Sequence, residues 1–218
     1  VTDKENTTLY THLAPQILSV EGTTIPYEEL QMWLARLDLS AQLDLHCVNK
    51  ALQQLSSPQA AEITFSLSLS TQLLRSDEPA KAFITLLQAA PEKAARLRFA
   101  FPEYGAYHHL EDFQRLSSKL QAIGCNVGIE QVGPEIANIG KLAGLGINYV
   151  VVDESVIHNI DDNNTQQIFL RGLCSIAHSI GLATYADGVN TEQELGTIKR
   201  LGIDGATGSY FRQDEASD

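Results

Sequence analysis

The sequence lacks the long apolar runs and the basic clusters that mark membrane-spanning and nucleic-acid-binding chains. Its 218 residues contain no uninterrupted apolar stretch of about 18, so no segment is expected to cross a membrane by itself. Lys and Arg number 15 against 27 Asp and Glu, which gives a formal net charge of −12. This charge argues against binding DNA or RNA through general phosphate neutralisation, but it is compatible with a small nucleotide in a local pocket.

The start of the chain, VTDKENTTLY, is polar and acidic, which is not typical of a secretory signal. Cysteine is rare, and Cys47, Cys125 and Cys174 are widely spaced within apolar patterns. We expect buried free thiols in a reducing compartment rather than a disulfide or metal site. The adjacent His108 and His109 make a poor zinc site, because neighbours on a helix point in different directions.

Alternating strand and helix patterns dominate the chain from residue 62 onward. Strands are expected at 62–70, 97–103, 126–132, 148–153, 182–188 and 203–211. Helices are expected between them at 79–95, 110–124, 136–146, 165–181 and 191–202, with Gly124 closing the second. A hairpin around Gly22 at 17–27 and a helical stretch at 28–55, broken near Asp38–Ser40, precede them.

These repeated units predict an α/β fold, either a (β/α)-barrel or a doubly wound sheet. The strand at 148–153 is apolar on both faces, as a buried parallel strand must be. Glycine-rich phosphate loops of the GxGxxG and GxxxxGK[ST] types are missing, so we favour the barrel. No linker or low-complexity segment divides the chain, which indicates a single domain.

Polar side chains follow the expected strands at the ends where barrels place their chemistry. They are Ser68, Glu103, Glu130, Gln131, Asp153, Asp187 and Thr207. A ring of acids and amides on one face is typical of a two-metal phosphodiesterase. Each residue taken alone also fits a simpler role, as a polar residue that ends a strand or caps the next helix.

The order and spacing of SLSLS, LRFAFPE, GIEQVG, YVVVD, YADGVNT and DGATGSYF resemble the EAL domain over residues 9–212. The resemblance implies a modified TIM-like (β/α)8 barrel whose first strand is antiparallel to the others. It also implies hydrolysis or binding of the bacterial second messenger cyclic di-GMP. Active members hold two Mg²⁺ or Mn²⁺ ions with oxygen ligands, and a lysine assists the chemistry.

Several metal-binding positions of the family are replaced in the first half of the chain. The signature Glu of Glu-Ala-Leu corresponds to His12, and the arginine that grips a phosphate corresponds to Gln16. The metal-ligating Asn of Asn-Leu-Ser reads Ser68. In place of Glu-Ile-Thr-Glu the chain has Ala100-Phe101-Pro102-Glu103, so the family's first Glu is lost and its second remains.

The second half departs from the family in the same way. The two metal-ligating aspartates of Asp-Asp-Phe-Gly-Thr-Gly read Glu130 and Gln131, and the second Gly of that motif reads Glu135. Lys-Ile-Asp becomes Val151-Val152-Asp153, without the catalytic lysine. Glu-Gly-Val-Glu becomes Asp187-Gly188-Val189-Asn190, and Gln-Gly becomes Thr207-Gly208.

These replacements predict an EAL domain that is not an enzyme and has no cofactor, its Mg²⁺ or Mn²⁺ centre being lost. The first hypothesis is a cyclic di-GMP receptor, because the C-terminal half most resembles LapD-type receptors. That resemblance implies a cytoplasmic domain of an inner-membrane protein that controls biofilm attachment, reaching the membrane only through other domains. The candidate ligand-binding residues are Gln16, Ser68, Glu103, Glu130, Gln131, Asp153, Asp187, Asn190 and Thr207.

The alternative hypothesis is a protein-interaction module that binds no nucleotide, comparable to CsrD-type proteins that influence RNA turnover. No Lys or Arg falls at the matched pocket positions, so a dianionic ligand would face carboxylates without a cation. The acidity of the chain favours a protein partner over direct contact with DNA or RNA.

The expected organisation is an N-terminal tail at 1–8, the EAL domain at 9–212 and a C-terminal tail at 213–218. The first strand of the family is expected to be missing or diverged, since VTDKENTT does not resemble it. A missing strand would expose the edge of the hairpin and favour pairing with a second chain. A homodimer or another protein partner is therefore expected.

Overall fold

Two compact units make up the chain. The computed structural model describes residues 1–3, 7–25, 27–57, 60, 62–133 and 144–212. Unit 1 comprises Val1–Thr11 and Val127–Asp218, and unit 2 comprises His12–Asn126. Within the described residues no helix is both long and apolar enough to span a membrane.

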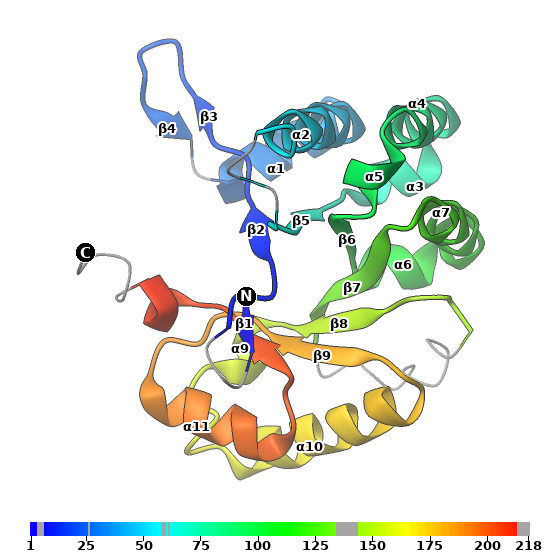
Figure 1. Cartoon of the computed structure of the whole chain (residues 1–218). Helices are drawn as coiled ribbons and strands as arrows, with labels where there is room; N and C mark the ends of the chain where they lie inside the picture. The colour runs from blue at the N-terminus through cyan, green and yellow to red at the C-terminus, as the bar shows by residue number, and fades with distance from the viewer. Residues whose placement is uncertain (4–6, 26, 58–59, 61, 134–143, 213–218) are drawn as a thin grey trace. The chain divides into compact units, whose positions relative to one another are not determined.

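Unit 1 is built on a mostly parallel sheet (Figure 1). Its parallel strands are β7 (Asn126–Val132), β8 (Tyr149–Val152), β9 (Ala183–Ala186) and β10 (Gly205–Ala206), each paired with the next. A short strand, β1 (Thr2–Asp3), pairs antiparallel with β10. A diverged first strand is thus present rather than missing, and the region expected as a tail contains it.

Helices follow β8 and β9 in unit 1. They are α9 (Glu154–Ile157), α10 (Asn164–Ser179) and α11 (Glu192–Leu201). Figure 1 shows α10 and α11 side by side, and α10 also contacts β9. The buried side of α10 presents Leu170, Leu173 and Ala177 at the three- and four-residue spacing of an amphipathic helix. This alternation confirms the predicted βα units in this part of the chain.

Three tyrosines fill the interior of unit 1. The ring centroids of Tyr10, Tyr149 and Tyr185 lie 5.4 to 6.4 Å apart, mostly in edge-to-face or tilted pairs, as aromatic clusters prefer. The Tyr149 ring lies against Gly128 so closely that a Cβ at Gly128 would overlap it. The glycine in β7 therefore makes room for a large side chain from β8.

Unit 2 begins with a hairpin and two helices, as the sequence predicts. Strands β3 (Ile17–Leu18) and β4 (Thr24–Ile25) form the hairpin after β2 (Thr11–Leu13). Helices α1 (Tyr27–Arg36) and α2 (Ser40–Gln54) lie within the helical stretch predicted at 28–55. The predicted break between them is confirmed, and Asp38 there has a left-handed φ of 54°.

The remaining elements of unit 2 are two parallel strands with helices after each. They are β5 (Phe65–Ser68), α3 (Thr71–Arg75), α4 (Asp77–Gln88), α5 (Pro91–Ala94), β6 (Leu97–Pro102), α6 (Glu103–His108) and α7 (Leu110–Ile123). Edge-to-face pairs of Phe83 with Phe99 and of Phe101 with Phe113 join β6 to α4 and α7. Gly124 ends α7 in the predicted left-handed conformation, with φ 100°.

The last strand is much shorter in the structure than the predicted range 203–211. Only Gly205–Ala206 pair as β10, and Ser209–Arg212 form a 3-10 turn, η2. The Val189 N–H donates to the Thr207 carbonyl at 3.0 Å, and the Tyr210 N–H donates to the Val189 carbonyl at 3.1 Å. The chain therefore leaves the ladder after Thr207 and follows the loop behind β9. Gly208 permits this, because a Cβ there would overlap the Val189 backbone.

Proline and capping residues explain the other differences. The predicted helix at 79–95 is divided because Pro91 has no N–H to continue α4 and instead starts α5. Three short helices that were not predicted, α3, α6 and α9, follow strands directly, and the Ser70 and Asp153 side chains cap α3 and α9. Most of the predicted helix at 136–146, with Pro134 and Glu135, lies outside the described residues. Cys47, Cys125 and Cys174 are free, and the last two are buried.

Asp44 on α2 is a buried carboxylate, only 7% exposed, at the start of α3. Its Oδ2 accepts hydrogen bonds from the Ser70 Oγ at 2.6 Å and the Ser70 N–H at 3.0 Å. Burial raises the pKa of Asp44 to about 6 despite these hydrogen bonds. The folded protein therefore binds this proton more tightly than the unfolded chain does.

We expect Asp44→Asn to remove a pH dependence of stability. Since the folded pKa is raised, stability falls in the wild type as the pH rises from about 4 to about 6. The amide keeps a carbonyl for Ser70 but does not titrate, so the wild type should lose on the order of 2 kcal/mol relative to the variant across this range. Urea unfolding at pH 4, 5, 6 and 7 measures this, with Asp162→Asn, at an exposed position, as the control. Parallel curves for wild type and Asp44→Asn would contradict the prediction.

Candidate functional site

A bulge in β7 carries Glu130 and Gln131, the two residues expected at the positions of the paired aspartates of EAL domains. Ile129 is paired with Val150 and Val132 with Val152, so Glu130 and Gln131 together lie opposite the single residue Val151. Gln131 is exposed and has a left-handed φ of 58°. Bulges of this kind change the direction of side chains at the end of a strand. Glu130 is half-buried beside the exposed Gln131.

The polar residues after β8, β9 and β10 lie in one row. The Asp153 N–H donates to the Val132 carbonyl, the Asp187 N–H to the Val152 carbonyl and the Thr207 N–H to the Ala186 carbonyl, at 3.0, 3.1 and 2.9 Å. Each bond continues the parallel ladder by one residue, so adjacent members of the row are about 4.8 Å apart along the sheet. Within unit 1, the predicted convergence at the carboxyl ends of the strands is present.

The side chains in this row also make local hydrogen bonds. The Asp153 Oδ1 accepts from the Ser155 N–H at 2.9 Å, and the Asp187 Oδ1 accepts from the Gly188 N–H at 2.8 Å. The Asn190 Nδ2 donates to the Gly188 carbonyl at 2.9 Å, and its Oδ1 accepts from the Ser209 Oγ at 2.5 Å. These side chains therefore stabilise the loops in which they lie. This is the simpler role, that of a polar residue at the end of a strand, which the sequence analysis considered for each of them.

The predicted residues of unit 2 are distributed over its strand ends and its N-terminal segment. Ser68 ends β5 and is paired in register with Ala100 of β6, which is 2% exposed. Glu103 is the first residue of α6 and is half-buried, whereas Gln16 is exposed before β3. Burial, together with the charge of Glu103, raises the pKa of Tyr107 to about 12.

Glu194 on α11 is a buried carboxylate beside these loops that the sequence analysis missed. Its side chain is nearly fully buried, and its Oε2 accepts from the N–H groups of Asn190 and Thr191 at 2.8 and 3.1 Å. Its Oε1 accepts from the Asn159 N–H at 2.9 Å. The carboxylate thus joins the loop after β9 to the loop between α9 and α10. The signal for it was the capping box of Thr191 and Glu194, a Thr-x-x-Glu pattern before an apolar run.

A second polar cluster that was not predicted lies at the opposite ends of β9 and β10. The Asp204 Oδ2 accepts from the Thr184 N–H at 2.8 Å and lies 2.8 Å from the His178 Nε2. Burial raises the pKa of Asp204, but its contacts with Thr184 and His178 outweigh burial and leave the pKa below its ordinary value. The aspartate and the Thr184 Oγ1 both approach the same imidazole nitrogen, which is not the arrangement of a nucleophilic triad.

A metal-binding group is not formed by the described residues. Among them, no three His, Cys, Asp or Glu side chains are close enough together to hold an ion. Val151, expected at the position of the family's lysine, lies in β8 opposite the bulge.

The family model for the EAL domain matches residues 2–214. The chain belongs to the EAL domain family. Among curated proteins, it is 24% identical over 190 residues to the probable diguanylate cyclase DgcE of Escherichia coli K12, covering 87% of this chain and 17% of DgcE. It is 25% identical over 169 residues to the cyclic di-GMP phosphodiesterase PdeF of the same organism, covering 76% of this chain and 22% of PdeF. The chain thus spans about a fifth of the length of these relatives.

Solved EAL structures share the fold. The Vibrio cholerae LapD S helix-GGDEF-EAL structure without ligand has a TM-score of 0.88 at 17% identity and covers 97% of this chain and 51% of that one. The Pseudomonas aeruginosa FimX EAL domain bound to c-di-GMP has a TM-score of 0.82 at 20% identity and covers 91% and 81%. These matches confirm the predicted fold class, the modified TIM-like α/β fold of EAL domains.

We expect Glu194→Gln to destabilise unit 1 by about 1 to 3 kcal/mol at pH 7, because an amide cannot accept on both sides. Burial raises the pKa of Glu194, but hydrogen bonds from Asn190, Asn159 and Thr191 outweigh it and hold the pKa below its ordinary value. Its stabilising effect is therefore present above pH 4.5 and is lost as the pH falls through the folded pKa.

Urea unfolding of the wild type and Glu194→Gln at pH 7, and at steps below pH 4.5, measures this. The difference in unfolding free energy should shrink at the acidic end. Glu192→Gln, an exposed residue in the same helical turn, is the matched control and should leave stability unchanged within about 0.5 kcal/mol. A pH-independent difference would contradict the role given to the Glu194 charge.

Proposed function

We propose that this chain is a catalytically inactive EAL domain that serves as a cyclic di-GMP receptor module of a larger, LapD-like protein. The observation that carries the proposal is the row of Asp153, Asp187 and Thr207 beside the Glu130–Gln131 bulge, at the strand ends where the family binds its ligand. FimX and LapD, which share this fold, have been solved with c-di-GMP bound.

The loss of catalysis rests on residues that cannot do the chemistry. Ala100 and Val151 offer neither a metal ligand nor a proton-transferring group, and they stand where active members have a metal-binding Glu and a lysine. The carboxylates of Asp153 and Asp187 each already accept a backbone hydrogen bond. A centre for two hard cations needs more free carboxylate oxygens than these positions supply. The proposal therefore includes no Mg²⁺ or Mn²⁺ cofactor.

Binding without metal depends on hydrogen bonds to the guanine bases and phosphates. Gln131, Asn190 and Thr207 carry neutral side chains that can donate to the phosphates and donate to or accept from the guanine bases. The acids of the row repel the two phosphates of the ligand. The affinity therefore depends on the balance between hydrogen bonds to the bases and this repulsion. Removal of a single negative charge near the phosphates should raise the affinity.

The cellular setting of the proposal follows from the relatives' greater length and from the likeness to LapD. The module would be the cytoplasmic part of an inner-membrane protein that controls biofilm attachment, connected to the membrane through other domains. Ligand binding would then change the state of the whole receptor. Expression of the full-length protein fused to a fluorescent reporter, followed by membrane fractionation, tests this placement.

A protein-interaction module is the second candidate, favoured by exposed apolar side chains in unit 2. On α1, Met32 and Trp33 are 53% and 51% exposed, and Leu37, directly after this helix, is 61% exposed. On the hairpin, Leu18 is 60% exposed, and Val20 is fully exposed. Exposed apolar groups of this size are typical of contact surfaces. The partner would be a second copy of the chain or another protein, as for the CsrD-type regulators.

Calorimetric titration with cyclic di-GMP, with and without Mg²⁺ and beside a hydrolysis control, tests the receptor. We expect micromolar binding, no turnover and no effect of Mg²⁺. No heat at protein concentrations that detect a dissociation constant of about 100 μM, or roughly 5 kcal/mol, would overturn it. Turnover that requires Mg²⁺ would overturn the loss of catalysis instead.

The variant Glu130→Gln is expected to bind cyclic di-GMP about three to ten times more tightly than the wild type, because it removes one negative charge facing the phosphates. Glu192→Gln removes the same charge from α11 and should leave the dissociation constant unchanged. Equal affinities of wild type and Glu130→Gln would place the ligand away from the bulge.

Light scattering at high protein concentration tests the second candidate. If α1 pairs with another copy, the wild type should exceed the mass of one chain, and Trp33→Ser should return it to that mass. Tyr104→Ser removes an aromatic side chain that is 70% exposed on α6 and should not change the mass. A wild type with the mass of one chain would leave only a different protein as the partner of α1.

A further inference from the structure

A buried carboxylate on α2 lies close to the carboxyl end of β5, within unit 2. Asp44 is only 7% exposed, and its Oδ2 accepts from the Ser70 N–H at 3.0 Å and from the Ser70 Oγ at 2.6 Å. Ser70 follows Ser68, a predicted ligand-binding residue at the end of β5, by two positions. Two residues span at most about 7 Å, so the carboxylate lies within about 10 Å of the Ser68 backbone.

The start of α3 is held by contacts that do not depend on the charge of Asp44. The Ala41 N–H of α2 donates to the Gln72 Oε1 at 2.9 Å. Helix α6 also packs so closely on α3 that a Cβ on Gly105 would overlap the Thr71 side chain. A protonated carboxyl keeps an oxygen that can accept the same hydrogen bonds. Protonation of Asp44 therefore removes a charge beside β5 and leaves the start of α3 in place.

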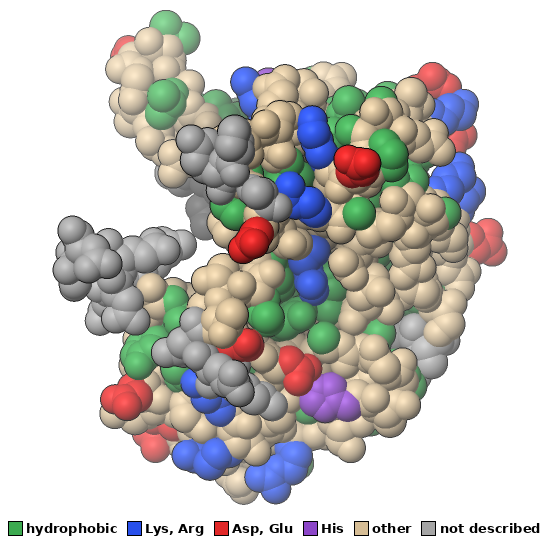
Figure 2. Space-filling view, viewed as in Figure 1, with side chains coloured by type: hydrophobic (Ala, Val, Ile, Leu, Met, Phe, Trp, Pro, Cys, Tyr) green, Lys and Arg blue, Asp and Glu red, His purple; other side chains and the backbone are tan. Residues whose placement is uncertain are grey.

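The charged groups of the neighbouring elements lie on the surface. Helices α1, α3 and α4 and strand β5 pack against α2, and β5 has no titratable side chain. The described charged side chains of the three helices are all exposed: Glu29, Arg36, Arg75, Asp77, Glu78 and Lys81. Figure 2 shows acidic and basic side chains side by side over α4, where Glu78 and Lys81 form an ion pair of 2.8 Å. Water screens such exposed charges, so they offset the buried charge of Asp44 only weakly.

On α2 itself, the charge of Asp44 acts on a neighbouring group inside the protein. His46 and Lys50 are exposed, whereas Cys47 is half-buried one turn along the helix from Asp44. Burial, together with the charge of Asp44, raises the pKa of the Cys47 thiol to about 11. A negative ligand within a similar range of the carboxylate would be affected in the same sense.

The carboxylate changes its charge just below neutral pH. Burial raises the pKa of Asp44 to about 6, even though Ser70 donates twice to the charged form. Between pH 5 and pH 7.5 the group therefore goes from mostly neutral to mostly charged. At pH 7.5 a ligand with two phosphates at Ser68 would be repelled by this charge, and at pH 5 it would not.

We propose that Asp44 makes the affinity of the cyclic di-GMP site depend on pH, with tighter binding when its carboxyl group is protonated. This regulation rests on the proposed function, with Ser68 among the residues that bind the ligand. By linkage, the bound ligand favours the protonated form of Asp44, so binding takes up protons near pH 6. The module would then respond to acidification by binding its ligand at lower concentrations.

The test is a calorimetric titration of wild type and Asp44→Asn with cyclic di-GMP at pH 5.0, 6.0 and 7.5. At pH 7.5 we expect Asp44→Asn to bind about three to ten times more tightly than the wild type, because the amide carries no charge. At pH 5.0 the two dissociation constants should be equal. Other carboxylates titrate in both proteins, so their effect cancels in this ratio.

Glu92→Gln is the matched control, because Glu92 is exposed on α5, which precedes the amino end of β6. It should bind as the wild type does at each pH. Binding by both proteins with equal affinities at every pH would overturn the regulation and leave the receptor in place. A ratio that is the same at pH 5.0 and pH 7.5 would also overturn it, because the substitution would then act through structure. No binding by either protein at any pH would overturn the receptor and its regulation together.

A measurement on the wild type alone covers the case in which Asp44→Asn does not fold. The carboxyl carbon of Asp44, followed by ¹³C NMR over pH 4 to 8, reports its protonation directly. With saturating cyclic di-GMP, the midpoint of this titration should move to higher pH by an amount that matches the fold-change in affinity. An unchanged midpoint in the presence of bound ligand would refute the role of Asp44.

Discussion

The backbone hydrogen bonds that continue the parallel ladder past β8, β9 and β10 determine where the polar side chains of unit 1 lie. Asp153, Asp187 and Thr207 each donate an N–H to the neighbouring strand, so their side chains emerge at one level and adjacent to one another. The bulge in β7 adds Glu130 and Gln131. The row is therefore a property of the sheet and would exist with other side chains at the same positions.

Retention of this backbone arrangement is compatible with loss of the chemistry. The parallel ladder requires only backbone groups, whereas a two-metal centre requires specific oxygen ligands on several strands. In this chain, Ala100 is buried and paired with Ser68, and Val151 is half-buried and paired with Tyr185, and neither side chain can act as a metal ligand. Asp153 and Asp187 accept hydrogen bonds within their own loops, which gives them a structural role that does not depend on a metal. Such a site is compatible with a receptor that recognises the guanine bases of its ligand through hydrogen bonds.

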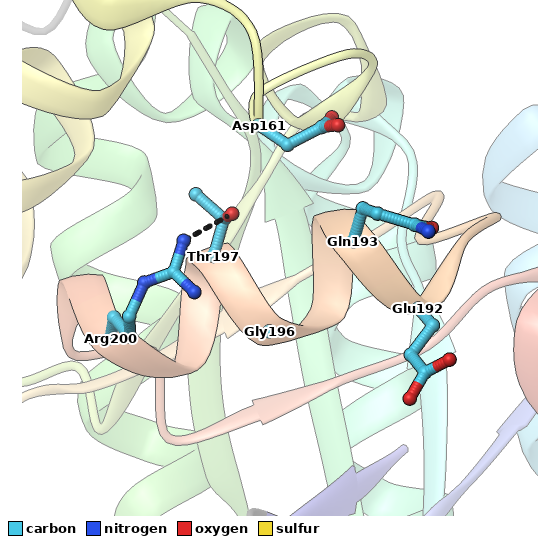
Figure 3. A pocket seen from close by; sticks show the side chains of 6 residues that line it. All are labelled: Asp161, Glu192, Gln193, Gly196, Thr197 and Arg200. Carbon is cyan, nitrogen blue, oxygen red and sulfur yellow. Dashed lines mark hydrogen bonds between the residues drawn. The ribbon is translucent and has the colours of Figure 1, made fainter.

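Glu194 shows how the loops around the row are held. Its carboxylate accepts N–H groups from two loops that are far apart in sequence, and the Asn190 side chain continues the connection to Ser209. A buried carboxylate tolerates this position because three donors replace its lost hydration. The same loop and helix also line a pocket that includes Asp161 and Arg200 (Figure 3).

Local pattern in the sequence was sufficient for the longer described strands and helices from β5 onward, for the break near Asp38 and for the Gly124 cap, but it missed β1 and the short helices α3, α6 and α9. The family motifs identified the family and the fold. Only the tertiary structure decided the length of β10, because the contact between Gly208 and Val189 links segments that are about 20 residues apart. It also decided the pairing of β1, the bulge opposite Val151 and the burial of Glu194 and Asp44. These features depend on contacts between distant segments, and periodicity along the chain does not encode such contacts.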